Sequence, residues 1–243
     1  MNYTASITDF FKSPKWGMNL LLAAICFIIP AIGPIVLQGW HITGFWAQRD
    51  ERDPAKFPAF DFQYFGKYLE RGIWPFLVSL VATFAFMAAM VVLIVLPLIL
   101  SGLLVTHSEN GTHNEFSIVM MVSMFVIYPI ALLIFYLIMT PLMLRASITQ
   151  DFVQSFNLGF MKSFVSLMLM ELIVTTLFMI GVGIVVMILT VVTCYIGGLF
   201  SFPVFLYGWH HLQKQLYLLY LSRGGEPVPV SRKLADLPPV LPL

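Results

Sequence analysis

The fold class is decided by residues 172–192, LIVTTLFMIGVGIVVMILTVV, which contain no charged side chain. An α-helix rises about 1.5 Å per residue, so this run is long enough to cross a bilayer core about 30 Å thick. The run belongs to one of five long apolar blocks in the 243-residue chain, at 17–47, 73–105, 117–144, 164–193 and 196–221. Overall 59% of the residues are hydrophobic and 10% are charged. The sequence therefore predicts an all-α, polytopic transmembrane helical bundle.

The composition and the short connections narrow the classes of function. The net charge of +1 gives no basic field for nucleic acid. Neither a glycine-rich phosphate loop nor another catalytic motif is found, so we expect no enzyme and no cofactor. The expected partners are the lipid bilayer and other membrane proteins or further copies of the chain. Cys26 and Cys194, the only cysteines, exclude a thiolate zinc site and leave a single disulfide open.

The basic residues predict how the chain is oriented. Lys and Arg gather at the N-terminus, in the loop 48–72, around Arg145 and Lys162, and after residue 222. The connection 106–116 and the turn 193–198 contain neither residue type. By the positive-inside rule the basic segments are cytoplasmic, so we expect a cytoplasmic (inner) membrane protein with both termini inside.

The first apolar block has basic residues on both flanks, so it should enter and leave the membrane on the same side. Pro30, Gly33 and Pro34 lie at its centre and favour a break. Two helices of about 13 residues would each be about 20 Å long, too short for a full span. We therefore predict a broken or re-entrant hairpin over 17–47. One long kinked helix with the N-terminus outside is the alternative.

Short motifs recur along the chain. The segment 5–10, ASITDF, returns at 146–152 as ASITQDF, with one inserted residue. The tripeptide Gly-Trp-His occurs at 39–41 and again at 208–210. We infer three repeat units within one transmembrane domain, 1–223, followed by a proline-rich cytoplasmic tail, 224–243. With units at about 6–48, 61–145 and 146–223, the chain would form about six membrane helices in three hairpins.

Aromatic residues spaced four apart predict short amphipathic helices on the cytoplasmic side, before the second and third hairpins. The stripe before the third hairpin comprises Ile148, Phe152, Phe156, Phe160 and Phe164. The stripe before the second hairpin comprises Phe60, Tyr64 and Tyr68, with Phe65 and Leu69. Such helices could simply anchor the hairpins or could recognise a partner.

Polar residues inside apolar helices are candidate functional groups, because they are costly at membrane depth. Counted along straight helices, Glu171, His41 and His210 lie at similar depth, and Asn19 and Gln38 could join them. The functional interpretation is a proton or cation site in which Glu171 exchanges. The structural alternative is a hydrogen-bonded cluster that fastens the hairpins. Two further alternatives are a bis-histidine haem and a loose metal site. The haem would use His41 and His210, and the metal site would use the loop residues His107, Glu109, His113 and Glu115.

The first third of the chain carries a family resemblance. Residues 28–40 read IIPAIGPIVLQGW, and the charged stretch RDERDP follows at 49–54. Next come FPAFD at 57–61 and FGKYLERG at 65–72. This order resembles the prokaryotic multi-pass membrane family called domain of unknown function 4013, most strongly over 16–80. The resemblance implies a helical bundle in a bacterial or archaeal cytoplasmic membrane. That family has no assigned reaction, so the resemblance assigns no functional residue.

The sequence leaves two candidate functions. A membrane component without catalysis, acting as a scaffold or accessory subunit, is favoured by the small polar inventory. A small transporter or channel-like protein with a buried Glu/His site is the alternative.

Overall fold

The computed structural model describes residues 1–47, 57–96, 98–99 and 120–234, and the described residues are helical with no strand. The all-α prediction is therefore confirmed. In chain order the elements are α1 (Tyr3–Thr8), η1 (Asp9–Lys12), α2 (Trp16–Ile28), α3 (Ile32–Ile42), η2 (Thr43–Ala47), η4 (Phe62–Tyr64), α4 (Phe65–Met90), η5 (Val91–Val95), η6 (Ser123–Ile127), α7 (Tyr128–Thr149), α8 (Phe152–Ser155), α9 (Leu158–Val192), α10 (Ile196–Ser222) and η7 (Arg232–Leu234).

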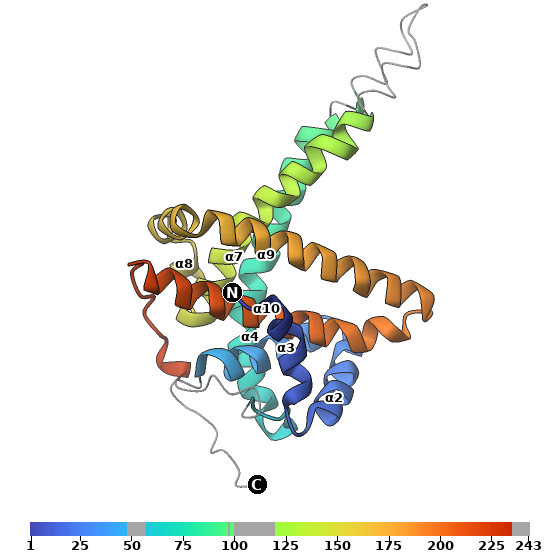
Figure 1. Ribbon diagram of the computed structural model, residues 1–243, viewed down its shortest axis with the longest axis vertical. Helices are drawn as coiled ribbons and strands as arrows, with labels where there is room; N and C mark the ends of the chain where they lie inside the picture. The colour runs from blue at the N-terminus through green and yellow to red at the C-terminus, as the bar shows by residue number, and fades with distance from the viewer. Residues whose placement is uncertain (48–56, 97, 100–119, 235–243) are drawn as a thin grey trace, which may run out of the picture.

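The long helices lie in two antiparallel pairs (Figure 1). In the first, α4 with η5 lies beside η6 with α7, and its far end projects away from the rest of the molecule. In the second, α9 and α10 are joined by a tight turn in which Cys194 and Tyr195 adopt positive φ. The short helices α2 and α3 pack against α10 and α4. The predicted external connection 106–116 lies outside the described residues.

Three helical segments of the described chain are long and apolar enough to cross a membrane: Phe62–Val95, Met120–Thr149 and Phe152–Val192. Helix α2 is apolar but has only 13 residues. Three spans thus follow from length and composition, and the count of six membrane helices remains a prediction.

The first apolar block is two short helices rather than one. Helix α2 ends at Ile28, and α3 begins at Ile32 after a turn in which Ala31 has φ 63°. Pro30 lies in this turn, and Pro34 lies in the first turn of α3, where the missing N–H removes no hydrogen bond. At Gly33, a Cβ atom would lie only 1.8 Å from the carbonyl oxygen of Cys26. Glycine therefore lets the two helices approach closely.

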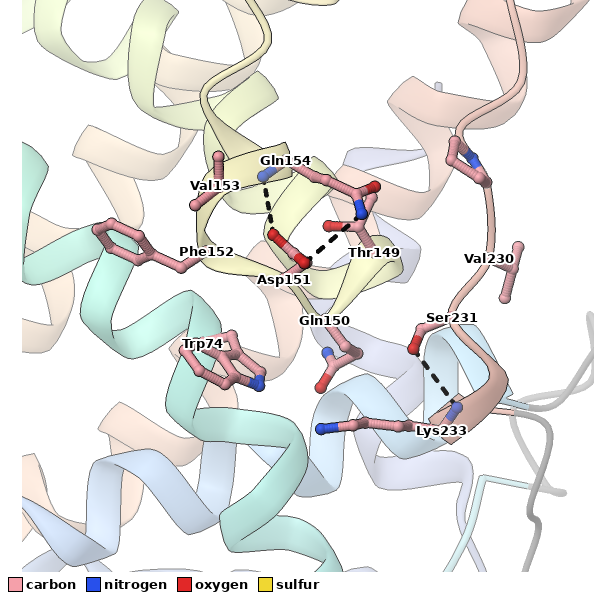
Figure 2. A pocket seen from close by; sticks show the side chains of 11 residues that line it. Trp74, Thr149, Gln150, Asp151, Phe152, Val153, Gln154, Val230, Ser231 and Lys233 are labelled. Atoms are coloured by element: carbon pink, nitrogen blue, oxygen red, sulfur yellow. Dashed lines mark hydrogen bonds between the residues drawn. The ribbon is translucent and has the colours of Figure 1, made fainter.

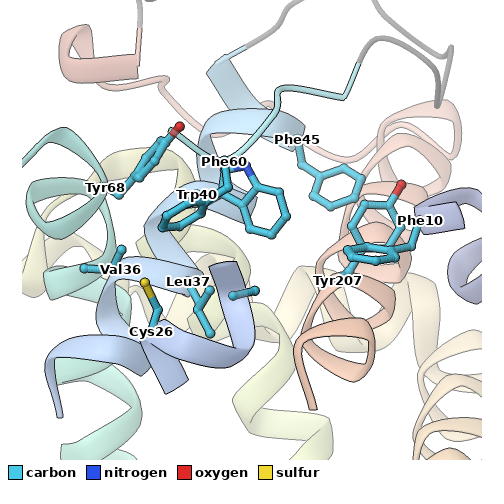
Figure 3. Packing of buried hydrophobic residues seen from close by; sticks show 10 residues of the cluster. Phe10, Cys26, Val36, Leu37, Trp40, Phe45, Phe60, Tyr68 and Tyr207 are labelled. Atoms are coloured by element: carbon cyan, nitrogen blue, oxygen red, sulfur yellow. The ribbon is translucent and has the colours of Figure 1, made fainter. Parts of the chain in front are cut away.

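A core of large aromatic side chains joins the N-terminal segments to α10 (Figure 3). Trp40 of α3, Tyr68 of α4 and Tyr207 of α10 are almost completely buried, and Phe10 and Phe60 pack with them. Burying this much aromatic surface is a strong driving force for folding. The core fixes α3 against both α4 and α10. Cys26 is buried in the same core and Cys194 is exposed; both are free thiols, so they form no disulfide.

The predicted amphipathic helix over 148–164 is wrong. Helix α7 continues to Thr149, Gln150 turns left-handed at φ 51°, and Asp151 caps the single turn of α8 through the N–H of Gln154. Asn157 then caps α9 by accepting from the N–H of Phe160, at 2.8 Å. Side chains that cap new helices therefore interrupt the stripe.

Most aromatic residues of the two stripes pack in cores instead of lying along surface helices, whereas Phe156 is exposed. Ile148, Phe160 and Phe164 meet in one core, although they come from two helices. The stripe before the second hairpin is also not a separate helix, because Tyr68 lies within α4 and Phe60 precedes η4.

The segment after α10 packs on the bundle over its described part. Val228 and Leu234 are buried, each in a different hydrophobic cluster. The N–H of Ser231 donates to the carbonyl of Ile148 at 3.0 Å. Arg71, buried on α4, donates to the carbonyl oxygen of Lys233 at 2.9 Å. These contacts fasten residues 228–234 to the ends of α4 and α7.

Candidate functional site

Two glycines set the position of α3 against α4 and so place His41. A Cβ at Gly39 would lie 1.7 Å from the carbonyl oxygen of Tyr68, and one at Gly72 would lie 1.9 Å from that of Ile35. The two backbones therefore touch at a glycine crossing. His41, half a turn beyond Gly39, is consequently driven into the protein interior, where it is fully buried.

His41 and His210 face each other in this interior. Their ring centroids are 5.5 Å apart, and the rings are inclined by 46°. His210 comes from α10 and is also fully buried. Around His41 lie Trp40 at 4.8 Å and Tyr207 at 6.0 Å between ring centroids. Two histidines from matching Gly-Trp-His tripeptides thus meet inside an aromatic core.

Three of the four ring nitrogens of this pair lack hydrogen-bond partners. Neither ring nitrogen of His41, nor Nδ1 of His210, has a hydrogen-bond partner in the described structure. The same holds for both side-chain amide atoms of Gln213, one turn beyond His210 and completely buried. A buried polar group without a partner costs about 1–3 kcal/mol. The arrangement is therefore unfavourable for stability and leaves imidazole nitrogens able to accept or donate a proton.

The other two candidates near the histidines have structural positions. Asn19 of α2 is buried, and its Oδ1 accepts from the N–H of Phe60 at 2.9 Å. This bond fastens the segment before η4 to α2. Gln38 lies on α3 and is half-buried. The other rings that His41 contacts are aromatic side chains, so of the five predicted residues the ring contacts join only His41 and His210.

Glu171 has a different partner, which sequence reasoning missed. Both of its carboxylate oxygens accept from the guanidinium of Arg223, and one of these bonds measures 2.9 Å. Arg223 lies directly after α10, and the acceptor carboxylate raises the pKa of its guanidinium. The Glu171 side chain is 22% exposed and the Arg223 side chain is 38% exposed. Glu171 is therefore an ion-paired residue at the end of the α9–α10 hairpin.

The depth assigned to Glu171 assumed a straight helix. In the structure Met168 has φ −123° and ψ 16°, so α9 bends three residues before Glu171. The bend is supported by Arg223, which donates to the carbonyl of Leu167 at 2.7 Å. One signal could have indicated this pair: Glu171 lies 22 positions before residue 193 and Arg223 lies 28 positions after residue 195, so the two returning helices bring both residues to the same half of the pair.

The haem alternative gains no fitting site among the described residues. The histidine pair is enclosed by Trp40, Phe57 and Tyr207, which a haem between the rings would have to displace. Over the described parts of the chain, no group of three or more His, Cys, Asp or Glu side chains could hold a metal ion. The loop with His107 and His113 lies outside those parts.

Fold and site together define an all-helical protein with three helices apolar enough to span a membrane and a histidine pair in its core. The chain belongs to the family described as protein of unknown function (DUF4013), whose model matches residues 22–195. The resemblance inferred from residues 16–80 is thus confirmed and extends through α9. A search of curated proteins found no match, and a search of solved structures found none either.

Proposed function

We propose that the protein is a membrane component without catalytic activity, a scaffold or accessory subunit of an assembly in the cytoplasmic membrane. Both termini would be cytoplasmic. The observation that carries this proposal is the ion pair between Glu171 and Arg223, because it gives the predicted exchangeable carboxylate a fixed partner.

The second carboxylate within the three candidate spans is paired in the same way. Glu70 lies 3.2 Å from the ammonium of Lys233, which also belongs to the segment after α10. A transport path needs inward-facing polar groups that line a cavity and can change partners. Both acidic side chains instead contact cations of one C-terminal segment. This arrangement favours a fastening role over an exchanging one.

The surface offered to a partner is the outer part of the α4–α7 hairpin. It projects beyond the other helices (Figure 1), and η5 and η6 pack mainly on each other and on the adjoining helices. Its exposed apolar side chains include Phe84, Val92, Met121 and Phe125, the last with 78% of its surface exposed. Within a bilayer, another membrane protein or a second copy of the chain can pack against such a face.

Site-specific photocrosslinking tests this proposal. A photoreactive phenylalanine at Phe125 should capture a protein at near-stoichiometric yield in native membranes. Val192, 74% exposed at the far end of α9, provides the matched control position and should capture little protein. Mass spectrometry of the adduct would separate a second copy from a different partner. Lipid adducts alone at position 125 would contradict the proposal.

The proposed orientation has a natural probe in Cys194. This thiol is exposed in the turn between α9 and α10, whereas Cys26 is buried. An impermeant maleimide added to intact cells should label Cys194, and Cys194→Ser should abolish the signal. With Cys194→Ser as background, a cysteine at Lys12 should react only after permeabilisation. The opposite pattern would place the termini outside.

A second candidate, a small proton transporter, is favoured by one observation: the unpartnered ring nitrogens of His41 and His210. Proton flux into proteoliposomes would test it. Transport through the pair predicts that His41→Leu abolishes flux and that Glu171→Gln preserves it. If the wild-type protein gives no proton flux in liposomes where a known carrier works, the transporter candidate is excluded and only the scaffold proposal remains.

A further inference from the structure

A pocket lies where the turn between α7 and α8 meets the C-terminal segment (Figure 2). Its volume is about 660 Å³, and it is lined by Trp74 of α4, residues 149–154, residues 229–231 and Lys233. Pockets of about 300–1,000 Å³ are typical of small-molecule sites. Neither the histidine pair nor Glu171 belongs to its lining, so it is a separate site.

The pocket is built where the two ASIT segments differ. Helix α1 ends at Thr8, and Asp9 continues directly into η1 with helical backbone angles. Helix α7 ends at Thr149, but the inserted residue, Gln150, then adopts φ 51° and ψ 37°. This left-handed residue redirects the chain so that Asp151 begins α8. The inserted residue therefore forms part of the pocket wall.

Gln150 supplies a buried acceptor to this wall. Its side chain is 4% exposed, and its Nε2 donates to the carbonyl of Ser147 at 2.9 Å. Its Oε1 has no hydrogen-bond partner in the described structure. Figure 2 places the Gln150 side chain between Trp74 and Lys233. Because buried polar atoms in native proteins are normally paired, Oε1 is suited to accept from a ligand that carries an N–H or O–H group.

Charges of both signs line the pocket. The Asp151 carboxylate accepts from the backbone N–H of Gln154 at 2.9 Å and from the Gln154 side-chain Nε2 at 3.5 Å, and its two oxygens keep further lone pairs for a ligand. In Figure 2 Gln150 lies between Asp151 and Lys233. The Lys233 ammonium lies 3.2 Å from the Glu70 carboxylate, and the Lys233 side chain is half exposed. Its ammonium also lies 6.0 Å from the ring centroid of Trp74. The lining thus suits a ligand that carries both a hydrogen-bonding cation and an anion.

The location points to a lipid as the source of that ligand. One candidate span ends at Thr149 and the next begins at Phe152, so the pocket lies where two spans meet the membrane surface. Tryptophan is enriched at this level of a bilayer. Val153 and Val230 are exposed apolar residues of the lining, suited to the start of an acyl chain.

We propose that this pocket binds the phosphoethanolamine headgroup of a membrane phospholipid. The primary ammonium donates to Gln150 Oε1 and to the Asp151 carboxylate, and the phosphate pairs with Lys233. Phosphocholine carries the same charges but has no N–H to donate. A cation–π contact between the choline group and Trp74 does not compensate for the lost hydrogen bonds, because the Lys233 ammonium already lies over the Trp74 ring. The proposal shares with the proposed function the membrane location and Lys233, whose ammonium also contacts Glu70.

Native mass spectrometry of the full chain in mild detergent tests the site. The protein is mixed with equal amounts of phosphatidylethanolamine, phosphatidylcholine and phosphatidylglycerol that carry identical acyl chains. We expect phosphatidylethanolamine adducts to exceed phosphatidylcholine adducts about tenfold, the effect of one charge-assisted hydrogen bond. Asp151→Asn should lower this preference, because the acceptor loses its charge, while keeping the helix cap, because asparagine also caps helices.

Lys233→Gln should weaken binding of the phosphate and lower the phosphatidylethanolamine signal. Lys67→Gln is the matched control, an exposed lysine of α4 outside the pocket, and should change nothing. Equal binding of phosphatidylethanolamine and phosphatidylcholine would overturn the proposal, as would a preference that Asp151→Asn leaves unchanged or a phosphatidylethanolamine signal that Lys233→Gln leaves unchanged.

Two further outcomes would also overturn the lipid site. Phosphatidylglycerol bound as well as phosphatidylethanolamine would indicate an anion site only. Adducts with soluble phosphoethanolamine as strong as those with the lipid would make the free compound the ligand. Loss of the lipid preference would leave crosslinking at Phe125 unchanged, so failure here and failure of the scaffold proposal are distinguishable.

Discussion

The two Gly-Trp-His tripeptides place the same three residues in different surroundings. In α3, Gly39 lies against the backbone of α4, and the indole N–H of Trp40 donates to the carbonyl of Pro58 at 3.0 Å. In α10, Gly208 lies against the Ile7 side chain, and Trp209 is half-buried against Tyr136. Only the histidines have equivalent positions, facing each other in the core. The difference teaches that a repeated motif can preserve one contact while the packing around it diverges.

The largest expected difference is at the glycines. Gly39→Ala should lower the free energy of unfolding by about 3 kcal/mol, because its Cβ would clash with a helix backbone that cannot move aside. Gly208→Ala should cost less than about 1 kcal/mol, since the nearest atom, Ile7 Cδ1 at 2.7 Å, ends a flexible side chain. Unfolding in mixed micelles, followed by tryptophan fluorescence, measures both. Equal costs would show that the two crossings are equally rigid.

The tryptophans should differ by a smaller amount. Trp40→Phe should cost about 2 kcal/mol, because it removes buried ring volume and leaves the Pro58 carbonyl without its donor. Trp209→Phe should cost less than about 0.5 kcal/mol, the usual effect at an incompletely buried position. Thermal melting of both variants in one detergent makes the comparison. A larger loss at Trp209 would show that this side chain is packed more tightly than Trp40.

The histidines test what the two motifs share. The double variant His41→Leu/His210→Leu should raise the free energy of unfolding by about 1 kcal/mol, because unpaired buried imidazoles are replaced by apolar groups. His211→Leu is the matched control. His211 lies 3.4 Å from Asp9 and 2.8 Å from Gln215, so its loss should destabilise. A destabilised double variant would indicate that the histidine pair has a polar partner in solution.

The smallest expected effect concerns Glu171 and Arg223, the partnered counterpart of the histidines. A double-mutant cycle with Glu171→Gln and Arg223→Gln should give a coupling of about 0.5–1 kcal/mol, because both side chains are partly exposed. Each single variant and the double variant are melted in the same detergent. A coupling above about 2 kcal/mol would indicate that the pair is shielded from water.

Much of the helix framework could be predicted from the sequence. The apolar block 164–193 corresponds to α9 (Leu158–Val192), and 196–221 corresponds to α10 (Ile196–Ser222). The break near Pro30 separates α2 from α3, as the proline and glycine positions indicated. The predicted helix over 148–164 failed because spacing alone does not register the caps at Asp151 and Asn157.

The sequence by itself determined the class of protein, the family and the positions of the helices, because hydropathy and helix-breaking residues act over short stretches of chain. Only the tertiary structure decided which polar groups meet. Glu171 meets Arg223 from 52 positions away, and His41 meets His210 across the aromatic core. The bend at Met168 and the glycine crossing at Gly39 set these contacts. Depth along a straight helix predicts neither, because a side chain's partner depends on bends and crossings that long-range packing creates.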